Sequence, residues 1–102
     1  MSLEAKIVTE DESILYLKGT ANHENIEELH KNLKELRRKR GESLFIDLSQ
    51  LDSIDSFALG AIMFENTLAK TIGRKLVLKK PSKAVSDILN LSNLNEVLII
   101  QK

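Results

Sequence analysis

The chain has 102 residues, of which 42% are hydrophobic, 29% are charged and 4% are aromatic, values typical of one domain with one hydrophobic core. Its 15 basic side chains balance its 15 acidic ones, and a formal net charge of zero argues against a dedicated nucleic-acid-binding protein. The absence of cysteine excludes disulfide scaffolds, thiolate metal sites and cysteine nucleophiles.

The first part of the chain contains two β-prone runs. Residues 6–9 form a short run, residues 14–18 (ILYLK) form a stronger one, and a turn-forming Asp-Glu-Ser sequence separates them. Two such runs around a short polar turn predict a β-hairpin. We expect the second strand to end at Gly19, which begins a Gly-Thr-Ala-Asn sequence.

An amphipathic helix is predicted next. Apolar side chains recur there at spacings of three and four residues: Ile26, Leu29, Leu33 and Leu36. Asn22 or Asn25 is suited to cap the first turn of this helix. Gly41 follows a basic run and is the kind of residue that ends a helix in the left-handed conformation.

The middle of the chain predicts a strand, a loop and a second helix. Residues 43–48 (SLFIDL) indicate a buried strand, and the polar residues 49–55 indicate a loop after it. The second helix is expected over residues 56–72, and Gly73 ends it.

The remaining residues predict a strand, a helix and a last strand. Residues 75–78 (KLVL) form the strand, Pro81 and Ser82 open a helix that ends near Asn90, and residues 96–100 (EVLII) form the last strand. The element order is therefore β-β-α-β-α-β-α-β. Strands that alternate with helices imply right-handed crossovers, so we expect an α/β protein with a single mixed, mostly parallel sheet of about five strands, covered by three or more helices.

The start of the second predicted helix is the most informative segment, because Asp55 and Ser56 stand there together. Free amide groups and the positive end of the helix dipole favour an anion at such a position. Ser56 is therefore a candidate phosphorylation site. The same pattern is also typical of a helix in which Asp55 or Ser56 acts as a cap and nothing more.

The charges are unevenly distributed along the chain. No Lys or Arg occurs at positions 41–69, where the acidic residues are Glu42, Asp47, Asp52, Asp55 and Glu65. Such a stretch is typical either of a solvated face or of a partner surface that steers association by charge, located around the start of the second helix.

The sequence IDSFALG at positions 54–60, after FIDLS at positions 45–49, resembles the signature of STAS domains, the anti-sigma factor antagonist family. In that family a strand that ends in Asp-Leu-Ser precedes Asp-Ser-(Ser/Thr/Phe)-Gly-Leu-Gly at the start of the second helix. Gly19, Gly73 and the segment 91–94 (LSNL) also fit the family pattern. The resemblance covers nearly the whole chain and implies a single STAS-like domain over residues 1–102 with the STAS fold.

The resemblance implies regulation of transcription by partner switching. Ser56 stands where the family has its regulatory phosphoacceptor, which an ATP-dependent anti-sigma factor kinase phosphorylates. The unphosphorylated antagonist binds this kinase and releases the sigma factor, and phosphorylation breaks the complex; a serine phosphatase is a further expected partner. The residues that the resemblance implies in partner binding are Asp55, Ser56, Phe57, Ala58, Gly60, Asn22 and Asp52.

Two positions of the motif depart from the form that has a second hydroxyl residue and a glycine. Phe57 replaces a second hydroxyl residue and Ala58 replaces a glycine, and both changes are similar to STAS scaffolds of the stressosome type. The alternative function is therefore a non-phosphorylated STAS scaffold or regulatory subunit, of stressosome type or associated with a lipid-transport ATPase.

Other function classes are less consistent with the sequence. A phosphoreceiver domain also carries an aspartate at a strand end, here Asp47, but needs an acidic pair after its first strand to hold Mg²⁺, and neither early strand is followed by a suitable pair. His23 and His30 are the acid–base candidates near neutral pH, and we expect them to be exposed on the first helix without a nucleophile beside them. We therefore expect no enzymatic activity, no cofactor and no metal.

Membrane insertion is not expected, because the apolar runs are far shorter than the roughly 20 residues needed to span a bilayer. The first residues also lack the apolar segment of a signal peptide. We expect a cytoplasmic protein that acts through protein–protein contacts and binds no nucleic acid.

Overall fold

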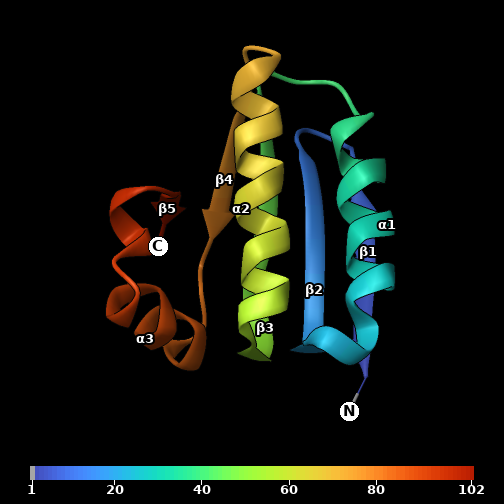
Figure 1. Ribbon diagram of the computed structural model, residues 1–102. Coiled ribbons are helices and arrows are strands. Elements are labelled where there is room, and N and C mark those ends of the chain that lie inside the picture. The colour runs from blue at the N-terminus through green and yellow to red at the C-terminus, as the bar shows by residue number, and fades with distance from the viewer. Residues whose placement is uncertain (1) are drawn as a thin grey trace.

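The computed structural model describes residues 2–102, which form a sheet layer and a helix layer (Figure 1). The sheet has five strands in the spatial order β1-β2-β3-β4-β5. Its strands are β1 (Leu3–Val8), β2 (Ser13–Ala21), β3 (Ser43–Ile54), β4 (Lys75–Lys79) and β5 (Ile99–Gln101). The helices are η1 (His23–Asn25), α1 (Ile26–Arg37), α2 (Ser56–Thr71), α3 (Lys83–Leu91) and η2 (Leu94–Glu96), where η marks a short 3-10 helix.

The strands β1 and β2 form the predicted hairpin. They pair antiparallel, from Leu3 opposite Gly19 to Val8 opposite Ile14. The other neighbouring strands pair in parallel, and a helix connects each of these pairs. The predicted element order and the mixed, mostly parallel sheet are therefore confirmed.

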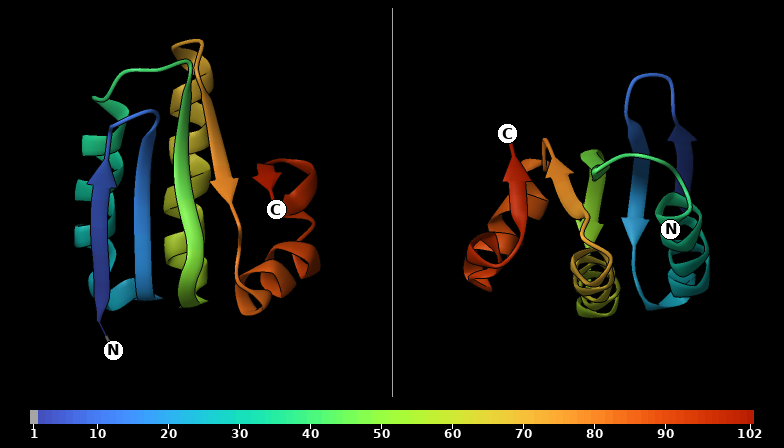
Figure 2. Two further views of the ribbon diagram at one scale, coloured as in Figure 1. Left: turned by 180° about the vertical axis from the view of Figure 1, so that it is seen from behind. Right: turned by 90° about the horizontal axis from the view of Figure 1, so that it is seen from above.

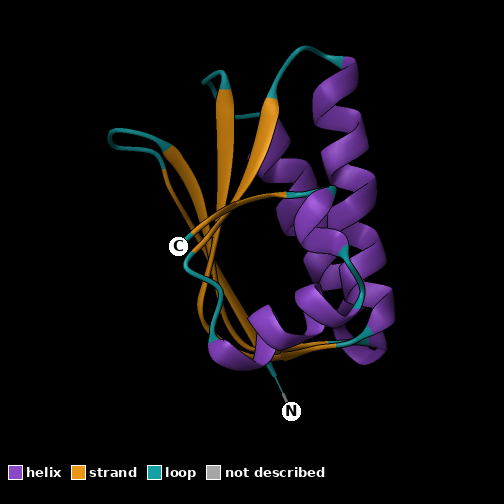
Figure 3. Cartoon of the chain, turned by 90° about the vertical axis from the view of Figure 1, so that its left-hand side faces the viewer, coloured by secondary structure: helices purple, strands orange, loops and turns teal. Residues whose placement is uncertain are grey.

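All three α-helices lie on one face of the sheet (Figure 2, Figure 3). Alternate side chains of the central strands point toward them and are almost fully buried: Leu15, Leu17, Leu44, Ile46, Leu76 and Leu78. The predicted apolar positions of α1 complete this core: Leu29, Leu33 and Leu36. Each such side chain stabilises the fold by roughly 1.5–3 kcal/mol. In the part of the chain that the structure describes, no α-helix covers the opposite face of the sheet, where Tyr16 and Ile99 are 40% and 42% exposed.

Strand β3 is longer than predicted and includes residues assigned to a loop. The prediction of a loop at positions 49–55 is wrong, because β3 continues to Ile54 and stays paired with β2. Leu51 and Ile54 point into the core and are 0% and 6% exposed. The polar residues fit because the pairing is irregular there, and Asp47 Oδ1 accepts hydrogen bonds from the Ser49 N–H and hydroxyl at 2.9 and 2.6 Å. The strand thus leads almost directly into α2.

Strand β2 also continues past its predicted end at Gly19. Gly19 has a φ of +99°, which favours glycine, at an irregularity in the pairing of β2 with β3. A Cβ at this position would collide with the carbonyl oxygen of Ser2, so glycine also permits the close approach of the chain start. The strand therefore reaches Ala21, which pairs with Ile54.

The last strand is shorter than predicted. It covers Ile99–Gln101 instead of residues 96–100. The Leu94 carbonyl accepts the N–H groups of Val97 and Leu98 at 3.0 and 2.8 Å, so the chain turns in this region. Three residues are left to pair with β4.

Candidate functional site

The carboxyl ends of β2 and β3 meet at one edge of the sheet, because these two strands are parallel neighbours. The Asp55 N–H donates to the Ala21 carbonyl at 3.0 Å. As a result η1, which follows β2, and α2, which follows β3, begin beside each other (Figure 1). The residues that this edge brings together are Asn22, His23, Asp55 and Ser56.

Asp55 is the N-terminal cap of α2, which confirms the capping prediction for this residue. Its Oδ1 accepts the Ala58 N–H at 2.9 Å, and its Oδ2 accepts the His23 N–H at 2.8 Å and lies 3.3 Å from His23 Nδ1. Desolvation alone would raise the pKa of Asp55, but these hydrogen bonds outweigh it and hold the pKa below its ordinary value of 3.8. At neutral pH Asp55 is a carboxylate that joins η1 to α2.

Ser56 is the first residue of α2, and it is exposed. Since Asp55 already caps the helix, the Ser56 hydroxyl is not required for capping. No acidic residue lies in the first turn of α2, and the N–H groups and helix dipole favour a negative charge there. The Ser56 hydroxyl is therefore accessible and electrostatically suited to carry a phosphate.

Apolar surface continues from Ser56 along the exposed side of α2. Phe57 and Phe64 are 64% and 60% exposed. Gly60 lies between them, and a Cβ added there would meet no atom within 4 Å. Large exposed aromatic side chains of this kind are typical of a protein-binding surface. Ser56, Phe57, Gly60 and Phe64 are called the α2 docking face below.

Three other residues of the predicted partner surface have different surroundings. The Asn22 side chain accepts the Glu24 N–H at 2.9 Å, and the Asn25 side chain accepts the Asn22 N–H at 2.9 Å, so Asn22 caps η1, which leads into α1. Asn25, the other predicted cap, precedes α1 directly, but its side chain makes no capping hydrogen bond there. Ala58 is fully buried and contributes its N–H to the cap of α2. Asp52 is exposed on β3. Asn22 and Ala58 thus support the backbone geometry of the site.

The acidic stretch at positions 41–69 is exposed in part. Glu65 and Asp47 are 4% and 8% exposed, so neither lies on a solvated acidic face. Glu65 Oε2 accepts a hydrogen bond from Arg37 Nε at 2.8 Å, which joins α1 to α2. Burial raises the pKa of Glu65, and the charge and hydrogen bond of Arg37 oppose this effect. Of the other three acidic residues, Asp52 and Asp55 precede α2 directly, whereas Glu42 is exposed at the opposite edge of the sheet, where β3 begins.

His23 is the site residue that the sequence analysis missed. Its side chain is 64% exposed, as expected, but its N–H and its ring contact Asp55, 32 positions further along the chain. Its ring centroid also lies 5.9 Å from that of Phe57. The sequence signal for this contact was that His23 and Asp55 each follow a strand closely. The carboxyl ends of parallel neighbouring strands meet at one edge of the sheet, so the residues after them lie close together.

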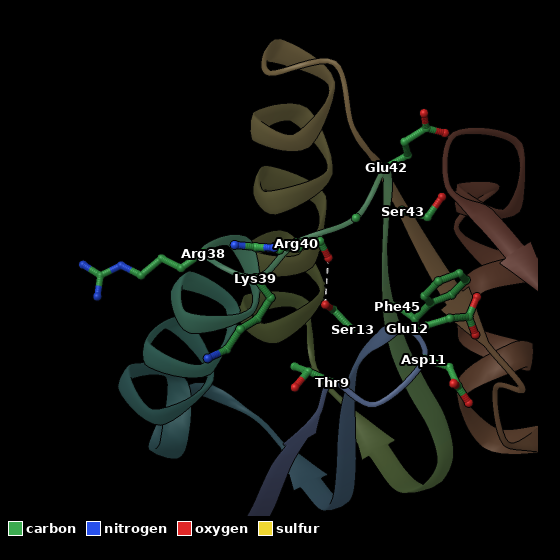
Figure 4. Close-up of a pocket in the computed structure, with 11 residues that line it drawn as sticks. Thr9, Asp11, Glu12, Ser13, Arg38, Lys39, Arg40, Glu42, Ser43 and Phe45 are labelled. Atoms are coloured by element: carbon green, nitrogen blue, oxygen red, sulfur yellow. Dashed lines mark hydrogen bonds between the residues drawn. The ribbon is translucent and has the colours of Figure 1, made fainter.

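A hollow of about 560 Å³ lies at the opposite edge of the sheet, where β2 and β3 begin (Figure 4). The Ser13 hydroxyl donates to the Arg40 carbonyl at 2.8 Å in its wall. Acidic and basic residues both line it, among them Asp11, Glu12, Arg38 and Lys39. Over residues 2–102, no group of three or more His, Asp or Glu side chains is placed to hold a metal ion.

Comparison with known proteins gives the family. The family model described as Mlab, STAS domain matches residues 7–101. TM1081 from Thermotoga maritima, a candidate anti-sigma factor antagonist, is 29% identical over 98% of this chain and 86% of its own, with a TM-score of 0.77. The anti-sigma factor antagonist SpoIIAA in its unphosphorylated form is 17% identical over 99% and 89%, with a TM-score of 0.75. SpoIIAA of Bacillus in its phosphorylated form is 15% identical over 99% and 92%, with a TM-score of 0.68.

The fold and its exposed helix start define a small α/β domain with a mixed sheet and a surface suited to protein contacts. The chain belongs to the STAS domain family, as its sequence motif predicts, and it has the SpoIIAA-like STAS fold. Within residues 2–102, no helix combines the length and the apolar character needed to cross a membrane.

Proposed function

We propose that this protein is a cytoplasmic, non-enzymatic anti-sigma factor antagonist that regulates transcription by partner switching. Unphosphorylated, it binds an ATP-dependent anti-sigma factor kinase, and phosphorylation of Ser56 releases it. The observation that carries this proposal is the exposed Ser56 at the first position of α2, directly after its Asp55 cap. The likeness to TM1081 and to SpoIIAA, which has been solved with and without its phosphate, supports it.

The α2 docking face explains how one phosphate would change binding. A phosphate adds a charge of about −1.5 to −2 at pH 7, here between the carboxylate of Asp55 and the exposed ring of Phe57. The fold tolerates this charge because the helix start favours anions. A partner that covers Phe57 would instead have to desolvate the phosphate, which costs binding free energy. Each 1.4 kcal/mol of binding free energy lost in this way weakens the complex about tenfold.

The test is phosphate transfer from ATP by the cognate anti-sigma factor kinase, followed by intact mass measurement and peptide mapping. We expect one added phosphate on the parent protein and none on Ser56→Ala. Ser92→Ala is the matched control, because Ser92 is an exposed serine at the C-terminal end of a helix, directly after α3, whereas Ser56 begins one. A phosphate on any other residue, or equal transfer to Ser56→Ala, would show that Ser56 is not the acceptor.

A second candidate function is a STAS scaffold or regulatory subunit that uses the same docking face without phosphorylation. Two observations favour it: the exposed rings of Phe57 and Phe64 need no phosphate to form a contact surface, and the matching family model is described as Mlab, STAS domain. No phosphate transfer, together with co-purification of other STAS proteins or of a transporter ATPase, would establish this second function over the first.

A further inference from the structure

The two segments that meet at the carboxyl edge of β2 and β3 have acidic side chains but neither Lys nor Arg. Residues 19–30 and 41–69 contain no such residue, and His23 and His30 are the side chains in them that can gain a positive charge near neutral pH. His30 lies seven positions further on, within α1. The acidic residues of the elements that meet at this edge are Asp55 and, on β3, Asp52, together with Glu24, Glu27 and Glu28 on the segment of His23 itself.

The position of His23 is fixed relative to the residues on both sides of Ser56. The His23 N–H is held by Asp55 Oδ2 at 2.8 Å, and its ring Nδ1 lies 3.3 Å from the same oxygen. On the other side the His23 ring lies 5.9 Å from the Phe57 ring, centroid to centroid, with a tilt of 54°. The backbone is thus anchored while the ring, 64% exposed and in one long contact with Asp55, is free to take another partner.

We propose that His23 is the counter-charge for a phosphate on Ser56, so that protonation of His23 and phosphorylation of Ser56 favour each other. This inference rests on the proposed function, because it takes Ser56 as the residue that is modified. In the unmodified protein the ring contacts Asp55. With phosphate present, the protonated ring turns to the phosphate oxygens, which carry more charge than the single carboxylate and lie next to it in the chain.

A phosphate monoester and an imidazole change charge in the same pH range. A phosphoserine loses its second proton near pH 6, and an unperturbed imidazole gains its proton near pH 6.5. An opposite charge nearby favours the charged form of each group, and such coupling is reciprocal. The charge that a partner meets on phosphorylated Ser56 would therefore depend on pH close to neutrality, being partly neutralised below it and fully exposed above it.

The inference is tested with phosphoserine incorporated at position 56 during synthesis, so that no kinase is involved. Proton and carbon NMR follow the rings of His23 and His30 through a pH titration, and phosphorus NMR follows the phosphate. We expect the titration midpoint of the His23 ring to rise by about one pH unit on phosphorylation, while that of His30, the internal control, moves by less than about 0.2.

The variant His23→Asn supplies the reciprocal measurement. Asparagine keeps the backbone N–H bond to Asp55 but cannot become positively charged, so the phosphate should titrate at a higher pH in this variant than in the phosphorylated parent. An equal shift of both histidines, no shift of His23, or an unchanged phosphate titration in His23→Asn would overturn the inference. Failure of a kinase to modify Ser56 would count against the proposed function and leave these results unaffected.

Discussion

Two acid–base pairs join the α1 side of the molecule to α2, and they differ in burial. Arg37 and Glu65 lie 2.8 Å apart, with the Glu65 side chain 5% exposed. His23 and Asp55 lie 3.3 Å apart, with side chains 64% and 31% exposed. A buried charge cannot lose its partner without a large energetic cost, whereas an exposed pair contributes little to stability and exchanges partners easily. The first pair is therefore part of the fold, and the second is available for regulation.

The largest expected effect is on the buried pair. Arg37→Ala should lower the free energy of unfolding by about 2–3 kcal/mol, because it leaves the Glu65 carboxylate buried without its partner. Urea denaturation at pH 7 measures this change. Arg38→Ala is the control, since Arg38 is 66% exposed and makes a 3.9 Å surface contact with Glu35; its cost should stay below about 0.5 kcal/mol. An equal loss of stability in both variants would contradict the distinction between the buried Arg37–Glu65 pair and an exposed ion pair.

The pH dependence of Arg37→Ala sharpens this prediction. Burial raises the pKa of Glu65 in the folded state above its ordinary value of 4.5. A raised folded pKa means that the contribution of Glu65 to stability is present below pH 4.5 and is lost as pH rises through the folded pKa. Loss of Arg37 should raise that pKa further. The difference in the free energy of unfolding between the parent and the variant should therefore shrink as pH falls from 7 to about 4.5. A deficit that is constant with pH would mean that the Glu65 charge is not its cause.

A smaller effect is expected at the exposed pair. Asp55→Ala should lower the free energy of unfolding by about 1 kcal/mol through loss of the α2 cap, and Asp55→Asn should restore most of it. Because hydrogen bonds lower the pKa of Asp55, its contribution is present above pH 3.8 and is lost as pH falls through the folded value. Urea denaturation of both variants measures the two changes in the free energy of unfolding, and urea denaturation of the parent as a function of pH measures the contribution of the Asp55 carboxylate. An asparagine variant as unstable as the alanine variant would assign the stability to the charge of Asp55 and not to its capping bond.

Much of the fold could be predicted from local sequence patterns. The leucines of α1 repeat at the spacing of a buried helix face, and Leu29, Leu33 and Leu36 are all buried. Asp55 and Ser56 stand where a short-range capping pattern places them. Such signals depend on residues within one or two turns of each other, so a single sequence contains them in full.

The missed features depend on contacts between distant parts of the chain. The second half of β3 was expected to be a loop because its polar residues resemble one, and its pairing with β2 is what makes it a strand. Glu65 was counted with the surface acids because its partner Arg37 lies 28 positions earlier, on another helix. His23 meets Asp55 because β2 continues past Gly19 to Ala21, which pairs with Ile54 at the end of β3.

Calorimetry with the cognate anti-sigma factor kinase measures whether the phosphorylation state of Ser56 decides partner binding. The unmodified chain and the chain with phosphoserine at position 56 are titrated under the same conditions. We predict that the phosphate weakens binding by at least about tenfold, which corresponds to 1.4 kcal/mol or more. Equal affinity of the two forms would contradict partner switching at Ser56.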